Sequence, residues 1–222
     1  MKITKETLFI SDTHFYHKNI LKFEPSRVES FQENHFENQE QMLVSNWNSV
    51  CGENQLIIHL GDFYYGRDKS LSEMKHLNGE KYLLKGNHDN AYADEVYESL
   101  GFTLIDTTIL DEALKENRTL LALLAEFQQL EHSHLLIFSF EGVRFLASHF
   151  QMTNTTEYDR KFRAQIRLLK AIFNEAECDF NLHGHTHSNL MDDERCINLS
   201  VEHIDFKPIS MGEIMERKIE EG

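Results

Sequence analysis

Proline is scarce in this sequence, with two residues in 222. The chain therefore has no Pro-rich linker, and it also lacks internal repeats and low-complexity tracts. A chain of this length suits one domain of the α/β class, although two small domains are an alternative. We expect residues 1–222 to form a single domain.

Cysteine is also scarce. Cys51, Cys178 and Cys196 are odd in number, lie far apart and form no C-x-x-C pair, which argues against a disulfide framework. No apolar run reaches the roughly 18 residues of a membrane-spanning helix. The first segment, MKITKETLFI, lacks the apolar stretch and cleavage site of a signal peptide. These absences predict inert thiols, a reducing cytoplasmic compartment and no membrane partner.

Positive charge is in deficit, because 22 Lys and Arg residues face 37 Asp and Glu residues, for a formal net charge of −15. Such a field repels nucleic-acid backbones and anionic membranes, which disfavours nucleic acid as a partner. Histidine, in contrast, is abundant, with 13 residues, and it is the commonest metal ligand among the side chains. Bound divalent cations would concentrate positive charge where an anionic substrate could bind.

Short apolar runs alternate with segments of helical periodicity. Strands are expected over residues 7–10, 56–60, 81–85, 135–140, 143–148 and 179–183, and helices over residues 39–50, 70–77, 91–100, 157–173 and 211–220. Ser70 and Glu73 resemble a capping box at the start of the second helix. Alternating strands and helices with one hairpin predict a layered α/β domain with mixed sheets.

The segment at about residues 110–132 reads as a helical insert. Its leucines cover more than one narrow stripe of a helix, and Glu116-Asn117-Arg118 could break it into two pieces. Three interpretations are open: packing in the core against the sheets, a homodimer interface, or a lid over a site.

The same order of residue types recurs at five predicted strand ends. Polar side chains that can bind metals follow each apolar run at once: Asp12 and His14, then Asp62, then Asn87 and His88, then His149, then His185 and His187. The sheet holds strand ends rigidly, and loops at one edge of an α/β sheet converge on a common crevice. The five segments are therefore predicted to place ligands around one point.

The types of ligand indicate two divalent cations. Carboxylate and amide oxygens with imidazole nitrogens, and no thiolate, fit manganese, iron, zinc or nickel better than calcium; manganese is the expected ion. A carboxylate can bridge two ions, and two ions about 3.5–4 Å apart can share a hydroxide and clamp a phosphoryl group.

In their order along the chain, these motifs resemble those of the calcineurin-like metallophosphoesterase family. The residues that carry the resemblance are Asp12-Thr13-His14, Gly61-Asp62, Gly86-Asn87-His88-Asp89, His149 and Gly184-His185-Thr186-His187. A weaker likeness to small bacterial and phage hydrolases lies in residues 9–15, 47–48, 59–63 and 198–202. The resemblance implies a four-layer αββα sandwich with mixed sheets.

The resemblance also implies roles for individual residues. One metal ion would be held by Asp12, His14, Asp62 and His187. The other would be held by Asp62, Asn87, His149 and His185, so that Asp62 bridges the pair. His88 would be catalytic without binding metal, protonating the leaving oxygen or stabilising its charge.

The sequence departs from the family pattern after Gly61-Asp62. Many family phosphatases continue with a further Asp and an Arg, which orient the catalytic histidine and bind phosphate. Here Tyr65 stands in place of the carboxylate, which disfavours activity of the protein-phosphatase kind. Arg67 and His17 lie close to these motifs in sequence and, with Asn87, are the candidate substrate contacts.

The expected function is hydrolysis of a small, nucleotide-like phosphodiester or phosphomonoester by attack of a hydroxide that bridges two metal ions. One alternative is a metal-dependent DNA nuclease; the acidic balance argues against it, and the one basic stretch is Arg160 to Arg167. Another is a non-catalytic protein-binding scaffold on the same fold. All the expected ligand positions are filled, which argues against a scaffold.

Overall fold

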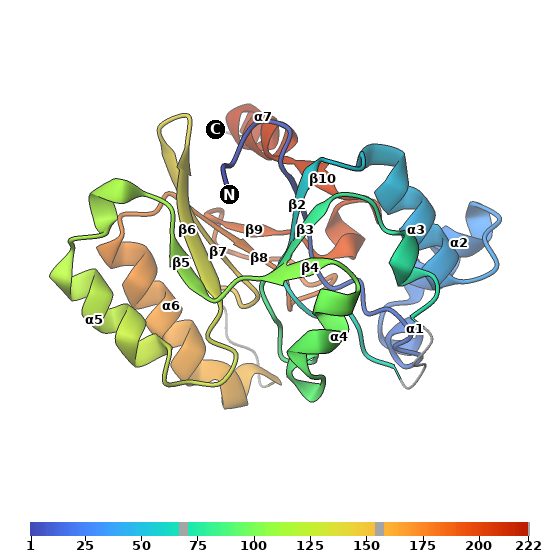
Figure 1. The fold of residues 1–222 in the computed structure, drawn as a ribbon, viewed down its shortest axis with the longest axis horizontal. Coiled ribbons are helices and arrows are strands. Elements are labelled where there is room, and N and C mark those ends of the chain that lie inside the picture. Colours follow the sequence, from blue (N-terminus) through green and yellow to red (C-terminus); the bar gives the residue numbers. More distant parts are fainter. Residues whose placement is uncertain (67–70, 154–157, 222) are drawn as a thin grey trace.

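Two five-stranded sheets form the centre of the molecule in a computed structural model that describes residues 1–66, 71–153 and 158–221 (Figure 1). The first sheet has the order β10-β1-β2-β3-β4, and the second has the order β5-β6-β7-β8-β9. The strands are β1 (Leu8–Ile10), β2 (Leu56–His59), β3 (Glu80–Leu83), β4 (Phe102–Leu104), β5 (Thr107–Ile109), β6 (Leu135–Phe140), β7 (Val143–Ser148), β8 (Phe180–His183), β9 (Cys196–Asn198) and β10 (Ile209–Ser210).

Both sheets are mixed. In the first, β1, β2, β3 and β4 run parallel, and β10 pairs antiparallel with β1. In the second, β6 and β7 form the predicted antiparallel hairpin, while β5, β8 and β9 pair parallel with their neighbours. Parallel pairing points the carboxyl ends of β1, β2 and β3 in one direction, and those of β7 and β8 likewise.

Helices cover the outer faces of the two sheets (Figure 1). They are α1 (Ile20–Phe23), α2 (Pro25–Glu33), α3 (Gln39–Val50), α4 (Asp94–Ser99), α5 (Arg118–Phe127), α6 (Arg163–Glu175) and α7 (Met211–Glu221), with 3-10 turns η1 (Met74–His76), η2 (Asp89–Ala91), η3 (Glu112–Leu114), η4 (Tyr158–Phe162) and η5 (Val201–His203). α3 lies against the first sheet, where Trp47 stacks on His59. α5 and α6 lie together beside the second sheet.

The alternation of side chains along β6 explains how the layers are joined. Leu136 and Phe138 point into the core between the sheets, where the ring of Phe138 stacks on Phe9 of β1 with centroids 6.0 Å apart. Leu135 and Ile137 point the other way, into a second core shared with α5 and α6. Successive side chains of a strand face opposite sides, so one strand serves both cores. The predicted four-layer αββα sandwich is confirmed.

Several predicted elements differ from the structure. The helix expected over residues 70–77 is wrong in its described part, which holds only the short turn η1; the predicted cap Ser70 lies outside the described residues. The helix expected from residue 91 begins at Asp94, because Ala93 is extended, with φ −68° and ψ 149°. The elements α1, α2, β4, β5, β9 and β10 had no counterpart in the sequence prediction.

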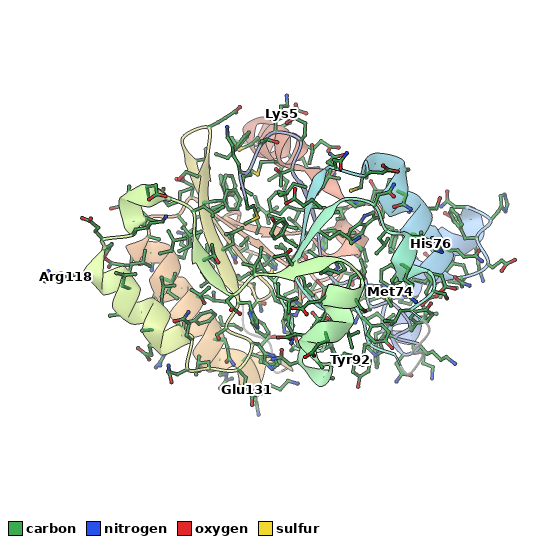
Figure 2. The ribbon with its side chains drawn as sticks, viewed as in Figure 1. Lys5, Met74, His76, Tyr92, Arg118 and Glu131 are labelled. Atoms are coloured by element: carbon green, nitrogen blue, oxygen red, sulfur yellow. The ribbon has the colours of Figure 1, made fainter. Side chains whose placement is uncertain are left out.

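The segment at about residues 110–132 forms two pieces, η3 and α5. Asn117 caps α5 by accepting a hydrogen bond from the Leu120 N–H group at 3.0 Å, which explains the break. Leu120, Leu124 and Phe127 are buried in the core that α5 shares with α6 and the second sheet. Core packing is therefore the arrangement observed. Figure 2 shows Arg118, at the start of α5, on the outer side of the molecule. A homodimer through this segment stays a prediction.

Replacing Leu120 with alanine is expected to lower the free energy of unfolding by about 2–5 kcal/mol, because Leu120 is fully buried and its loss leaves a cavity. Chemical denaturation measures the change. The neighbouring Leu121 is 44% exposed, so Leu121→Ala is the matched control, with an expected change within about 0.5 kcal/mol. Equal losses in the two variants would contradict core packing of this face of α5.

No helix in the described part of the chain is long and apolar enough to cross a bilayer. The prediction of a single domain over residues 1–222 stays a prediction.

Candidate metal centre

The loops that follow β1 and β2 lie side by side. The Asp12 N–H group donates to the Gly61 carbonyl at 3.0 Å, and the His14 N–H group donates to the Asp62 carbonyl at 3.0 Å. Across the site, the His185 N–H group donates to Asp12 Oδ2 at 2.9 Å, which ties the loop after β8 to the loop after β1. Hydrogen bonds donated by backbone N–H groups, to carbonyls and to the Asp12 carboxylate, therefore join the loops of both sheets at the point where the predicted ligands meet.

Positive φ angles are concentrated in these loops. Asp12, His14, Asp62, His185 and His187 have φ of 56°, 48°, 54°, 67° and 47°. Side chains with a Cβ rarely adopt this region, and such residues cost on the order of 1–3 kcal/mol each when the surrounding structure holds them there. Strain of this kind gathers at sites where side chains must be aimed at one point.

Two buried carboxylates form the middle of the site. Asp62 Oδ2 lies 3.6 Å from His14 Nε2 and 3.5 Å from His149 Nε2. Asp12 Oδ1 lies 3.7 Å from His14 Nε2 and 3.9 Å from His187 Nε2. These atoms make two groups, each within 4.8 Å: Asp12 with His14 and His187, and Asp12 with Asp62 and His149. The sequence predicted that Asp62 links the two ions. In the two groups above, the shared residue is Asp12. Asp62 belongs to the second group, and its Oδ2 atom lies near a histidine of each group, His14 and His149.

Oxygen atoms next to the histidine rings orient them toward the site. His149 has Nδ1 3.0 Å from the Leu60 carbonyl, and its Nε2 faces Asp62 and Asn87 Oδ1, the latter at 3.1 Å. His187 likewise has Nδ1 3.4 Å from Glu202 Oε1. When Nδ1–H donates to an oxygen, Nε2 keeps its lone pair for the site; this is the arrangement usual for histidines that bind metals.

His185 stands slightly apart. Its ring packs against that of His149, with centroids 5.1 Å apart, but it belongs to neither group of closely spaced ligand atoms. Its Nε2 lies 2.9 Å from Asp159 Oδ1, a contact that orients the ring. Asp159 was not singled out in the sequence, because it lies 26 residues from His185 in a segment without a motif.

Asp89 has a structural role that the sequence motif did not reveal. Its carboxylate accepts hydrogen bonds from the N–H groups of Asp62, Phe63 and Gly86 at 2.6, 3.1 and 2.8 Å, and from the Tyr97 hydroxyl at 3.0 Å. One buried side chain therefore clamps the loop after β2 to the loop after β3. A carboxylate is the acceptor suited to several converging N–H donors.

Gly86 and Gly61 permit this close approach. Gly61 has φ of +105°, and a Cβ at this position would lie 2.5 Å from the backbone nitrogen of Gly86. Any side chain here would push apart the two loops that carry Asp62 and His88.

Arg27 stabilises the loop after β1, which carries Asp12 and His14. This fully buried residue of α2 donates to the carbonyls of Asp12 at 2.7 Å and Thr13 at 3.1 Å, and to Glu202 Oε1 at 2.7 Å through Nε. Glu202 in turn faces His187. A buried charge persists when it is paired and fully hydrogen-bonded, so Arg27 fixes the backbone that presents Asp12. Neither Arg27 nor its pairing with Glu202 could be inferred from the sequence, where 175 residues separate them.

His88 lies at the open edge of the site. Its side chain is 26% exposed, and its Nε2 is 3.8 Å from Asp62 Oδ2. The ring of Tyr65 packs edge-on against it, with centroids 4.6 Å apart. Tyr65 thus contacts His88 at the position where the sequence lacked the family's orienting carboxylate. His17 is also here, with Nδ1 3.2 Å from His14 Nδ1, whereas the candidate Arg67 lies outside the described residues.

The electrostatics of the site favour cations. Burial, together with the neighbouring Asp12 and Asp89, raises the pKa of Asp62 well above its usual value. Burial lowers the pKa of His14 and His149 well below the usual value, so both rings are neutral at pH 7. Asp12 Oδ1 and His14 Nε2 are buried without a hydrogen-bond partner among the described residues. Divalent cations would relieve the repulsion between carboxylates and use both orphaned atoms, so these residues fit metal ions.

Comparison with known proteins finds similar chains in several organisms. An uncharacterized protein from Methanocaldococcus jannaschii is 25% identical over 231 residues, covering 98% of this chain and 93% of its own. A crystal structure of a protein of unknown function from Aquifex aeolicus has a TM-score of 0.67 and 29% identity, covering 95% of this chain and 97% of that one. A predicted phosphoesterase from Streptococcus pneumoniae has a TM-score of 0.33 and 14% identity, covering 87% and 70%.

The sequence model of the calcineurin-like phosphoesterase family matches residues 6–189. The matched region contains the loops after β1, β2, β3, β7 and β8, and therefore every predicted ligand. The chain belongs to the calcineurin-like phosphoesterase family.

Proposed function

We propose that the protein hydrolyses a small phosphate ester, a diester or a monoester, with two divalent cations held between its two sheets, and that manganese serves in this role. The observation that supports the proposal most directly is the pair of ligand groups that share Asp12, one with His14 and His187 and the other with Asp62 and His149. Two adjacent ions, when bound, supply an activated water and neutralise charge on the phosphoryl oxygens.

The residues that would hold the ions lie on two sides of the site, one beside Asp12 and the other beside Asp62. His14 and His187 lie on the side of Asp12, while His149 and Asn87 lie on the side of Asp62. The rings of His149 and His187 are held through Nδ1, so each presents Nε2 to the site. The ring of His185 is held through Nε2 by Asp159. Rings that the protein itself orients lower the cost of reorganisation during reaction.

His88 is placed to act on the leaving group. Burial lowers its pKa to about 4, so the ring is neutral at pH 7 and still carries one N–H group. From the open edge of the site, that group can donate to the oxygen of the departing alcohol as negative charge develops there. The backbone N–H group of His88 donates a hydrogen bond to Asp62 Oδ1 at 2.8 Å, which fixes the backbone that carries this ring.

The charge distribution favours a small substrate over nucleic acid. Arg163, Arg167 and Lys170 of α6 line a cavity of about 840 Å³. Three acidic side chains, Asp192, Asp193 and Glu194, line the same cavity. Because these acids line the same cavity, the cations of α6 do not form an uninterrupted basic track of the sort that follows a phosphate backbone.

A direct test is turnover by manganese-loaded protein of bis(4-nitrophenyl) phosphate, 4-nitrophenyl phosphate and supercoiled plasmid. We expect manganese-dependent release of nitrophenolate from at least one of the esters and intact plasmid. Nicked plasmid with inert esters would favour a nuclease. No turnover of any substrate in protein that binds two manganese ions would contradict the proposal.

Replacing Asp159 with alanine is expected to weaken manganese binding about 10–100-fold, because His185 loses the acceptor that orients its ring. Titration calorimetry with manganese measures the change. Asp159→Asn keeps an oxygen acceptor at the same place, so it should lose less than the alanine variant. Unchanged manganese affinity in Asp159→Ala would contradict a positioning role for this carboxylate.

A further inference from the structure

A cavity of about 1220 Å³ opens beside the candidate metal centre. Four of the residues that line it are tyrosines, Tyr16, Tyr64, Tyr65 and Tyr92, and His17 lines it as well. Tyr92 precedes α4 and marks this region in Figure 2. Two other cavities, of about 840 and 330 Å³, are lined by none of the predicted site residues.

The tyrosine rings are held in fixed positions. The hydroxyls of Tyr64 and Tyr92 both donate to the carbonyl of Gly66 at 2.9 Å, and the two rings pack with centroids 4.6 Å apart. The ring of Tyr16 meets Tyr64 edge-on. Since the hydroxyls of Tyr64 and Tyr92 are already bonded to the backbone, the aromatic rings are what these two side chains offer to a ligand.

The cavity adjoins the reactive part of the site through Tyr65 and His17. The ring of Tyr65 lies 4.6 Å from His88 and 4.6 Å from His17, centroid to centroid. His17 in turn contacts His14, a predicted ligand. A phosphate ester that reaches both the metal centre and His88 therefore has its organic group beside Tyr65, at the mouth of the cavity.

The charge of the walls is unusual for this chain. Among the described residues that line the cavity there is no carboxylate, and Lys18 contributes a positive charge, although the whole chain has a formal charge of −15. The described part of the walls thus repels neither a neutral ring nor an anionic ester. Rings packed edge-on and face-on form favourable contacts with a further planar ring.

We propose that the cavity lined by Tyr16, Tyr64, Tyr65 and Tyr92 binds the organic group of the substrate, and that this group carries a planar aromatic ring, either a nucleobase or a simple aryl group. The inference rests on the proposed phosphoesterase function and adds the class of ester on which it acts. Tyr65 is the residue that joins ring binding to His88.

Phosphonates test the inference without turnover, because their carbon–phosphorus bond resists hydrolysis by this chemistry. Titration calorimetry with manganese-loaded protein would compare methylphosphonate, cyclohexylphosphonate and phenylphosphonate. We expect phenylphosphonate to bind about tenfold more tightly than methylphosphonate, as one stacked ring typically contributes, and more tightly than cyclohexylphosphonate, which has similar bulk but is not planar. The methylene phosphonate analogue of AMP distinguishes the two sources: tighter binding than phenylphosphonate indicates a nucleobase.

Variants of Tyr65 provide the structural control. Tyr65→Leu should lose most of the preference for phenylphosphonate while methylphosphonate binds as before, and Tyr65→Phe should keep the preference. If methyl- and phenylphosphonate bind the unaltered protein equally, or if cyclohexylphosphonate matches phenylphosphonate, the inference is overturned and the proposed function stands. If no phosphonate binds in the presence of manganese, both fail.

Discussion

Asp62→Ala is expected to abolish turnover and the binding of divalent cations together. One oxygen of this carboxylate lies within 3.6 Å of both His14 Nε2 and His149 Nε2, and the other accepts the His88 N–H group. The loss of an ion that stabilises charge in the transition state costs several kcal/mol, which corresponds to a rate lower by at least about 10³-fold.

Elemental analysis of the purified variant and its rate with bis(4-nitrophenyl) phosphate would test this expectation. The metal-free variant should unfold at a temperature no lower than the metal-free parent, because the substitution removes a buried carboxylate from beside Asp12 and Asp89. That result would separate loss of the site from loss of the fold. Asp106, whose side chain is 89% exposed, provides a control, and Asp106→Ala should keep both metal and activity. An Asp62→Ala protein without metal but with full turnover would refute the proposed function.

The sequence was sufficient to predict the strand ends because two physical patterns coincide there. A strand buried on both faces reads as a short apolar run, as in β2 and β7, and a ligand cannot stand inside such a run without burying an unpaired polar group. The change from apolar to polar residues after Leu60 and Ser148 therefore marks both the end of the strand and the start of the site. The loops after β1, β3 and β8 follow the same rule, and the structure brings all five together.

The side chains that orient the predicted ligands could not be predicted in this way. Arg27 and Glu202, or His185 and Asp159, are paired through tertiary contacts alone, and no spacing in the sequence connects them. Short elements were missed for a related reason. β4 and β5 have three residues each, too few for periodicity to be visible, and they form because neighbouring strands provide partners. The segment at about residues 110–132 was ambiguous since burial against α6 and a dimer interface require the same apolar surface.

His88→Ala, in contrast to Asp62→Ala, is expected to leave both cations bound and to slow turnover by roughly 10²–10⁴-fold, the usual contribution of a positioned proton donor. His88 belongs to neither group of closely spaced ligand atoms, and its ring stands at the open edge between Asp62 and Tyr65. Its removal should therefore leave the carboxylates and the other histidines in place.

The dependence on the leaving group distinguishes donation by His88 from a general disturbance of the site. An alkoxide needs the donated hydrogen bond far more than nitrophenolate does, because it is the stronger base. With methyl 4-nitrophenyl phosphate as substrate, His88→Ala should therefore slow the release of methoxide more than the release of nitrophenolate. The products formed by the variant should shift further toward nitrophenolate. His76, an exposed residue of η1, is the matched control, and His76→Ala should change neither rate nor products. A uniform loss for both leaving groups, accompanied by loss of manganese, would show that His88 holds the metal centre together and does not act on the departing oxygen.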